Sequence, residues 1–470
     1  MKNSSLTEGS ILKSLWALSV PIVFANLLQT AYQLTDTFWV GRLGGAAVAA
    51  VSVSFPIIFL LVSLGGGLTI AGTILVAQFK GRNHQTAMDH ITSQTFLLVF
   101  VVSLLLSVLG ILLSPLLLRL MGTETVIFEQ ALVYLKISFA GLLFSFVFMA
   151  FQSLLRGIGD VKTPAIIVLG TVLLNVLIDP LFIFGWGPVP PMGVKGAAIA
   201  TLITQAAAAV IGLHILIGGS YGIRLALRDL VPDLPLIGKV FELGFPASIE
   251  HSARALGTMA ITFLVAGFGT QALAAYGIGS RVLSFVIIPS IGLSMATSTL
   301  VGQNFGAGQI QRAERIAVLS AWAGFVPLTV IGVLFFAFAE GIAAVFIPRE
   351  PETIRASAVM IRYLSVSFGL IGAQMALNGA FRGSGNTLIT MMLSILTLWV
   401  LQLPTAWVLS RYTAMGVNGL WASFPAANIV TAFVSISWFR TGRWKRRRLT
   451  EEIKVKETVL EEVLAEKGLS

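Results

Sequence analysis

The sequence predicts an all-α polytopic membrane protein, with twelve transmembrane helices arranged in two six-helix lobes. The first observation is composition: among 470 residues, 56% are hydrophobic and 11% are charged, whereas about a quarter of the residues of a soluble protein are charged. The second is that apolar stretches of roughly 20 residues or more, the length needed to cross a bilayer, recur along the chain. The third is an internal repeat of half the chain.

The repeat has a period of about 225 residues. Residues 18–21 (Leu-Ser-Val-Pro) return as 243–246 (Leu-Gly-Phe-Pro), and residues 156–160 (Arg-Gly-Ile-Gly-Asp) return as 382–386 (Arg-Gly-Ser-Gly-Asn). Each half holds six apolar spans, so both halves enter the membrane in the same direction. The two halves are therefore expected to be parallel repeats, related by a pseudo-twofold axis along the membrane normal.

The spans follow from apolar runs separated by short loops rich in glycine or charge. The first run, from about Ile11 to Val40, is too long for a signal peptide and is taken as the first span. Prolines inside several spans are compatible with transmembrane helices. The twelve expected spans are 14–40, 46–76, 87–113, 128–154, 162–184, 194–217, 237–265, 272–299, 313–337, 354–381, 387–409 and 416–439. The predicted domains are an N-lobe (1–217), a cytoplasmic linker (218–236), a C-lobe (237–440) and a basic, then charged, cytoplasmic tail (441–470).

The net charge of +10 is explained by the orientation of the chain in the membrane rather than by nucleic-acid binding. Most of the 31 lysines and arginines fall on the side of the N-terminus, including the basic cluster at 443–448. This bias predicts a multi-pass protein of the cytoplasmic (inner) membrane with both termini in the cytoplasm. Membrane lipids are therefore expected partners, and nucleic acid is not. The chain has no cysteine, which excludes disulfides and thiolate metal sites.

Two acidic residues lie inside spans of the first half. Asp36 and Asp179 are placed at a similar depth, near the outer ends of the first and fifth spans, and Asp36 corresponds to Ile261 in the second half. A carboxyl inside a membrane needs a partner or water. Two nearby carboxyls repel each other when both are ionised, so such a pair can take up a proton or coordinate Na⁺. The structural alternative is that Asp179 caps backbone freed by Pro180 and that Asp36 holds a helix end.

Helical spacing adds polar side chains to this pair. Residues three, four and seven positions apart share one face of a helix, and a hydroxyl on the sixth span reaches the same level. The predicted cation-coupling site consists of Asp36, Asp179, Asn175, Thr201, Gln29 and Tyr32.

The second half carries charges of a different kind. Glu250 and Arg254 lie four residues apart on the seventh span and can neutralise each other, and Arg281 on the eighth span then needs another partner. A structural salt bridge and a transport role are both compatible with this pattern. No acidic residue occurs from Thr353 to Thr450, so the last three spans offer no carboxylate to a cation.

Several functional classes are excluded by missing motifs. The sequence has no P-loop, no His-Glu-x-x-His, no Cys/His cluster and no nucleophile elbow. The chain is therefore predicted not to be an enzyme and to need no cofactor. The remaining classes are a carrier driven by an ion gradient, a flippase for lipid-linked substrates, and a receptor with a transporter-like fold.

Residues 10 to 440 resemble the multidrug and toxic compound extrusion (MATE) family. The most specific segment runs from Gln29 to Gly44 (QTAYQLTDTFWVGRLG). Val76-Ala77-Gln78-Phe79-Lys80-Gly81, the Arg-Gly-Ile-Gly-Asp segment at 156–160, Asn175 to Pro180 and Gly193 to Ala198 occur in the same order as in the family. Asp36, the Asn175 and Asp179 pair, and Thr201 match the polar positions of the DinF-like branch.

The resemblance implies an antiporter that exports amphipathic organic cations in exchange for H⁺ or Na⁺ by rocker-type alternating access. It further implies that the coupling ion, with Na⁺ as the one candidate metal, binds at Asp36 and Asp179. The protein is expected to function as a monomer. The alternative within the same superfamily is a flippase for lipid-linked saccharides. The residues expected to contact the substrate are Phe148, Met149, Met259, Met295, Glu250, Arg254 and Arg281.

Overall fold

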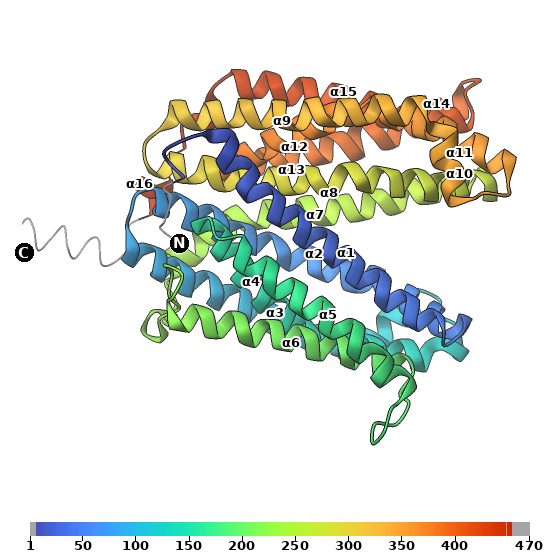
Figure 1. Ribbon diagram of the computed structural model, residues 1–470, viewed down its shortest axis with the longest axis horizontal. Coiled ribbons are helices and arrows are strands. Elements are labelled where there is room, and N and C mark those ends of the chain that lie inside the picture. The colour runs from blue at the N-terminus through green and yellow to red at the C-terminus, as the bar shows by residue number, and fades with distance from the viewer. Residues whose placement is uncertain (1–5, 448, 454–470) are drawn as a thin grey trace, which may run out of the picture. The chain divides into compact units, whose positions relative to one another are not determined.

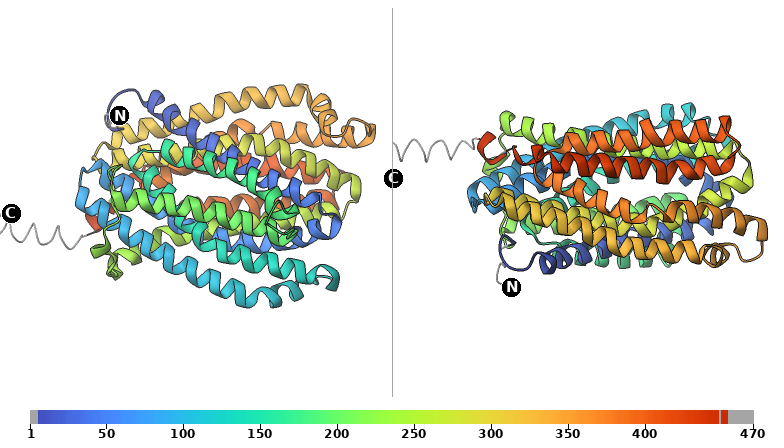
Figure 2. Two further views of the ribbon diagram at one scale, coloured as in Figure 1. Left: turned by 60° about the horizontal axis from the view of Figure 1, so that its bottom comes forward. Right: turned by 90° about the horizontal axis from the view of Figure 1, so that it is seen from above.

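The computed structural model describes residues 6–447 and 449–453 as an assembly of long helices (Figure 1). Figure 2 shows the same helices from two further directions. The helices of the first sequence repeat are α1 (Ile11–Gly41), α2 (Gly45–Gly81), α3 (Gln85–Leu120), α4 (Thr125–Ile158), α5 (Lys162–Phe184) and α6 (Val194–Gly218). A short 3-10 helix, η1 (Leu227–Leu230), lies in the linker.

The second repeat contains more breaks. Its elements are α7 (Leu234–Ala266), α8 (Thr270–Gly306), α9 (Ile310–Ala337), α10 (Ala339–Phe346), α11 (Pro351–Ser365), α12 (Phe368–Gly383), α13 (Thr387–Ile395), the π-helix η2 (Leu396–Gln402), α14 (Leu403–Tyr412) and α15 (Val417–Arg440). After them come η3 (Arg443–Lys445) and α16 (Leu449–Glu452).

Within the described residues, ten helices are long and apolar enough to cross a membrane. The segment from Thr387 to Tyr412 counts as one of them, and α11 and α12, bent by 47° at a short break, supply an eleventh. Helix α7 is 33 residues long, but Glu250 and Arg254 in its middle lower its hydropathy. With α7 the helices match the predicted twelve, and the all-α polytopic fold with two six-helix lobes is confirmed.

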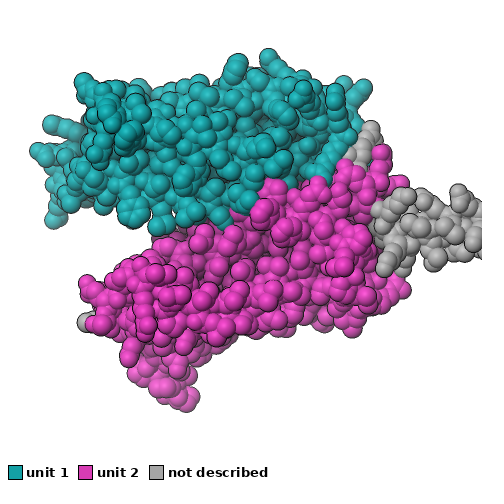
Figure 3. Space-filling model, turned by 180° about the vertical axis from the view of Figure 1, so that it is seen from behind, with its two compact units in different colours: residues 1–23, 249–448 teal, residues 24–248, 449–470 magenta. Residues whose placement is uncertain are grey.

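The chain divides into two compact units (Figure 3). The N-unit comprises residues 24–248 and 449–453, and the C-unit comprises residues 6–23 and 249–447. Two helices therefore pass from one unit to the other, α1 after Val23 and α7 after Ser248. In both, a proline precedes the crossing point, Pro21 in α1 and Pro246 in α7. The predicted lobe boundaries at 217 and 237 follow the sequence repeat and stay a prediction.

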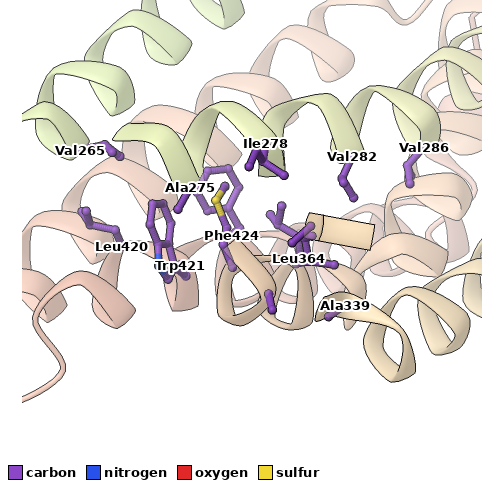
Figure 4. Close-up of a cluster of buried hydrophobic side chains, with 14 of the residues drawn as sticks. Val265, Ala275, Ile278, Val282, Val286, Ala339, Leu364, Leu420, Trp421 and Phe424 are labelled. Carbon is purple, nitrogen blue, oxygen red and sulfur yellow. The ribbon is translucent and has the colours of Figure 1, made fainter. Parts of the chain in front are cut away.

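Each unit has its own apolar core. In the C-unit, side chains from α7, α8, α11 and α15 meet around Trp421, which is 1% exposed and stacks on Tyr276 (Figure 4). In the N-unit, Ile74 and Leu75 of α2 pack with Phe151 and Leu154 of α4, all fully buried.

Glycines allow the central helices of each unit to approach closely, and the same close approach occurs in both sequence repeats. A Cβ added at Gly157 of α4 would lie 2.9 Å from Val76 Cβ and 3.0 Å from the Thr73 carbonyl oxygen of α2. At the equivalent position of the second repeat, a Cβ at Gly383 of α12 would collide with the Ser298 carbonyl oxygen of α8. The two repeats thus pack their second and fourth spans through the same pair of positions.

The segment after α15 is anchored in both units. Trp444 is fully buried in the C-unit against Phe305, Phe381 and Phe439. Leu449 and Ile453 belong to the core of the N-unit. Residues 449–453 of the predicted charged tail thus place two apolar side chains in a core, while Glu451 and Glu452 between them are exposed. Residues 448 and 454–470 of that predicted tail lie outside the described residues.

We expect Gly383→Ala to lower the free energy of unfolding by about 1–3 kcal/mol, because the added methyl group meets backbone atoms that cannot turn away. The matched control is Gly277→Ala in α8, where no atom lies within 4 Å of the added Cβ and alanine favours the helix. Thermal unfolding of the purified variants in detergent measures the difference. Equal melting temperatures for the two variants would contradict the close approach.

Candidate functional site

The fifth span places two polar side chains inside the N-unit. Asn175 and Asp179 lie four residues apart on α5, both fully buried, and Asn175 Nδ2 donates a hydrogen bond of 2.8 Å to Asp179 Oδ1. Asp179 Oδ2 and Asn175 Oδ1 are buried without a hydrogen-bond partner among the described residues. A buried oxygen left unpaired costs about 1–3 kcal/mol, so these two atoms mark a place for a donor or a cation.

The first span supplies the second carboxyl. Asp36 follows Tyr32 by four residues on α1, and its Oδ1 is buried with no partner in the described part of the chain. The Tyr32 hydroxyl lies 2.9 Å from Thr204 Oγ1 on α6, which fixes α1 against α6 at this level. The Asp36 and Asp179 carboxyls are close enough for their charges to interact.

The N-unit site therefore combines two carboxyls, an amide and hydroxyls from α1, α5 and α6. Thr201 Oγ1 is also buried, beside the Tyr32 hydroxyl, and the oxygens of Asp36, Asp179 and Asn175 remain open. Oxygen-only ligand sets suit hard cations, and a carboxyl pair also takes up a proton. Among the described residues, no group of three or more His, Cys, Asp or Glu side chains is placed to hold a metal, so a metal here would need the amide and hydroxyl oxygens.

Two residues of this site were missed by the sequence analysis. Thr204 lies three residues after Thr201 on the same face of α6, a signal that helical spacing offers. Tyr134 of α4 is 9% exposed and lies within electrostatic range of Asp36, Tyr32 and Asp179, but a single tyrosine in an apolar span gives no such signal. Gln29, predicted to join the site, is exposed and forms no described hydrogen bond with it.

The C-unit holds a charged cluster in the middle of α7. Glu250 is 1% exposed, and its Oε1 lies 2.6 Å from Arg382 Nη2 and 3.5 Å from Arg254 Nη2. Ser394 donates to the same oxygen at 3.1 Å. The predicted pairing of Glu250 with Arg254 is present, but Arg382 of α12 is the nearer partner, and 132 residues of sequence separate it from Glu250. Arg281 is exposed.

The apolar residues expected to contact substrate are divided between the units. In the N-unit, Phe148 stacks on Phe151 and is half-buried, and Met149 packs against a second apolar cluster. In the C-unit, Met259 is exposed and Met295 is half-buried. The contacts of Phe148 and Met149 agree with a packing role, and a role for the four in binding stays a prediction.

Comparison with known proteins identifies the family. The MatE family model matches residues 21–181 and again residues 246–408, so both copies begin at the proline that precedes a unit crossing. This chain belongs to the MATE family. Its members are transporters and not enzymes, so the chain is a multi-pass membrane transporter of small molecules.

Individual relatives of this MATE protein match nearly its whole length. It is 30% identical over 451 residues to the probable multidrug resistance protein YoeA of Bacillus subtilis, covering 95% of this chain and 97% of that protein. It is 27% identical to a protein of Shewanella oneidensis named FAD transporter, over 90% of this chain and 93% of that one. A crystal structure of a MATE protein in the bent conformation matches with a TM-score of 0.88 at 24% identity, covering 94% and 97% of the two chains. The names of these relatives thus indicate more than one kind of substrate, drugs for the Bacillus protein and FAD for the Shewanella protein.

We expect Arg382→Met to destabilise the protein by about 3–5 kcal/mol, because it leaves the buried Glu250 carboxylate without its nearest partner. The double variant Glu250→Gln/Arg382→Met should recover part of the loss, since the buried carboxylate is then neutral and only Arg254, whose side chain is 37% exposed, loses a charged partner. Arg362→Met, which breaks an exposed ion pair with Glu340, is the control and should cost about 1 kcal/mol or less. Thermal unfolding distinguishes the three, and an equal loss in the single and double variants would contradict the pairing.

Proposed function

We propose that the protein exports amphipathic organic cations in exchange for H⁺ or Na⁺, by rocker-type alternating access of its two lobes. The observation that supports this most is the pair of carboxyls in the N-unit, each with a buried oxygen that lacks a described partner. The proposed coupling site comprises Asp36, Asp179, Asn175, Thr201 and Tyr32, with Gln29 at its edge. Membership of the DinF-like branch, an inner-membrane location, cytoplasmic termini and a monomeric state belong to the same proposal.

Coupling requires that occupancy of the site favour one arrangement of the protein over another, because only a difference in affinity shifts a conformational equilibrium. Helix α1 is suited to this role. Its residues 24–41 belong to the N-unit and carry Tyr32 and Asp36, while its first residues belong to the C-unit. Neutralising Asp36 removes its repulsion with Asp179, and the change acts on a helix that both units share.

Pro21 adds the means for α1 to respond. A proline inside a helix removes one backbone hydrogen bond and permits a bend. It lies two residues before the point where α1 leaves the C-unit. A bend there reorients the segment that carries Asp36 without disturbing the segment packed in the C-unit.

We expect Asp36→Asn and Asp179→Asn each to abolish ethidium flux driven by an ion gradient in proteoliposomes, because an amide neither binds a proton nor neutralises a cation. Glu352→Gln, the same chemical change at an exposed residue of α11, should transport like the wild type. Imposing a pH gradient and then a Na⁺ gradient identifies the coupling ion. Full flux in the Asp36→Asn variant would refute the coupling site, and no wild-type flux with either gradient would refute cation export.

A further inference from the structure

The cluster around Glu250 carries more positive than negative charge. Two guanidinium groups, Arg254 and Arg382, share one carboxylate. Helix α8 contains no Asp or Glu, and none occurs between Thr353 and Thr450. Glu314 of α9, a helix that packs on α8 and α12, is paired with Lys445 at 2.6 Å. The described residues of the C-unit therefore leave about one positive charge at this level without a counter-ion.

The unmatched charge is that of Arg254. Arg382 is 13% exposed and lies 2.6 Å from the carboxylate, while Arg254 is 37% exposed and its one contact with the carboxylate is long, at 3.5 Å. Within the described part of the chain, the Nε and Nη1 groups of Arg254 donate no hydrogen bond. Glu250 Oε2 is buried, so the carboxylate has no accessible oxygen with which to engage them.

The exposed side of Arg254 needs a polar environment. The residue lies near the midpoint of α7, which runs from Leu234 to Ala266, and hydrocarbon cannot solvate a guanidinium group. Its free donors therefore face water or a ligand. A planar guanidinium with two adjacent donors is the side chain best suited to a carboxylate or a phosphate.

The backbone beneath Arg254 is held in place by the π-helix η2. Trp399 Nε1 donates a hydrogen bond of 3.0 Å to the Ala253 carbonyl oxygen, and a Cβ at Gly257 would collide with Leu398. Single π-helical turns often occur at functional sites. Trp399 is 39% exposed and is bonded to the residue before Arg254, so an aromatic surface is available in the same part of the C-unit for the apolar part of a ligand.

We propose that Arg254 anchors a binding site in the C-unit for the anionic group, a carboxylate or a phosphate, of an amphipathic molecule. Glu250, Arg382 and Ser394 position the guanidinium, and Trp399 contacts the apolar part of the ligand. The site is separate from the carboxyl pair of the N-unit and does not depend on the proposed export of cations. It extends the ligands of the protein to molecules that carry an acidic group.

Two dyes with the same xanthene ring and opposite charge test the site: fluorescein, an anion, and rhodamine 6G, a cation. Binding to the full chain in detergent is followed by fluorescence polarisation. We expect Arg254→Gln to weaken fluorescein binding about tenfold or more, the loss of one charged hydrogen-bonding group, and Arg254→Lys to retain part of the affinity. Rhodamine 6G binding should not weaken. Glu250→Gln, which removes the negative charge beside Arg254 and Arg382 but keeps an oxygen that accepts their hydrogen bonds, should tighten fluorescein binding.

Arg362→Gln, the same change at an arginine of α11 that is paired with Glu340, serves as the control and should bind both dyes like the wild type. Unchanged fluorescein binding in Arg254→Gln, or equal weakening of both dyes, would overturn the proposal. If Arg254→Gln does not fold, Arg254→Lys and Glu250→Gln test the proposal instead. Arg254→Lys should weaken the binding of fluorescein but not of rhodamine 6G, and Glu250→Gln should tighten the binding of fluorescein. Unchanged fluorescein binding in both variants would overturn the proposal. Competition identifies the source of the anion: displacement by benzoate indicates a free acid, and displacement by dihexanoyl phosphatidylglycerol alone indicates a lipid headgroup.

Discussion

Hydrocarbon supplies no hydrogen bonds, and the rest of the structure depends on this constraint. Every polar group inside the apolar helices must find its partner within the protein. Most do so locally: Ser54 donates to Ala50 one turn earlier, and Thr73 reaches the Ser153 carbonyl oxygen on a neighbouring helix. Several buried polar atoms of the described spans have no such partner, and among them the open oxygens of Asp36 and Asp179 are distinguished because two carboxyls from different helices lie close enough for their charges to interact.

The two halves of the chain share a scaffold and differ in charge. The close approach at Gly157 is repeated at Gly383, so packing between the second and fourth spans was retained after duplication. Asp36 has no equivalent in the C-unit, where Ile261 occupies the corresponding position, and Arg254 of the C-unit corresponds to Gln29, whereas Arg382 repeats Arg156 of the first half. Duplicated packing with different polar residues gives one fold two chemically distinct interiors.

The sequence was sufficient to predict the fold class and the spans, because both follow from composition and from the length of the apolar runs. It also pointed to Asp36 and Asp179, because charged side chains inside apolar helices are rare enough to demand a reason. It did not reveal Arg382 as the partner of Glu250, since that contact joins residues far apart in sequence and Arg382 lies in a glycine-rich segment that suggested a loop. Tyr134 and Thr204 were missed because a hydroxyl in an apolar helix usually bonds its own backbone. The polar composition after Arg440 concealed Trp444, Leu449 and Ile453, three apolar side chains that fill cores.

The anchoring of both ends of the chain has a consequence for biosynthesis. The residues made first, including Leu6 and Gly9, hydrogen-bond to Asn304 and Arg312 of the C-unit, which are made some 300 residues later. The residues made late, Leu449 and Ile453, complete a core whose other members come from the first half. Each unit can therefore complete its packing only after residues far along the chain have been made, residues 304–312 for the C-unit and residues 449–453 for the N-unit.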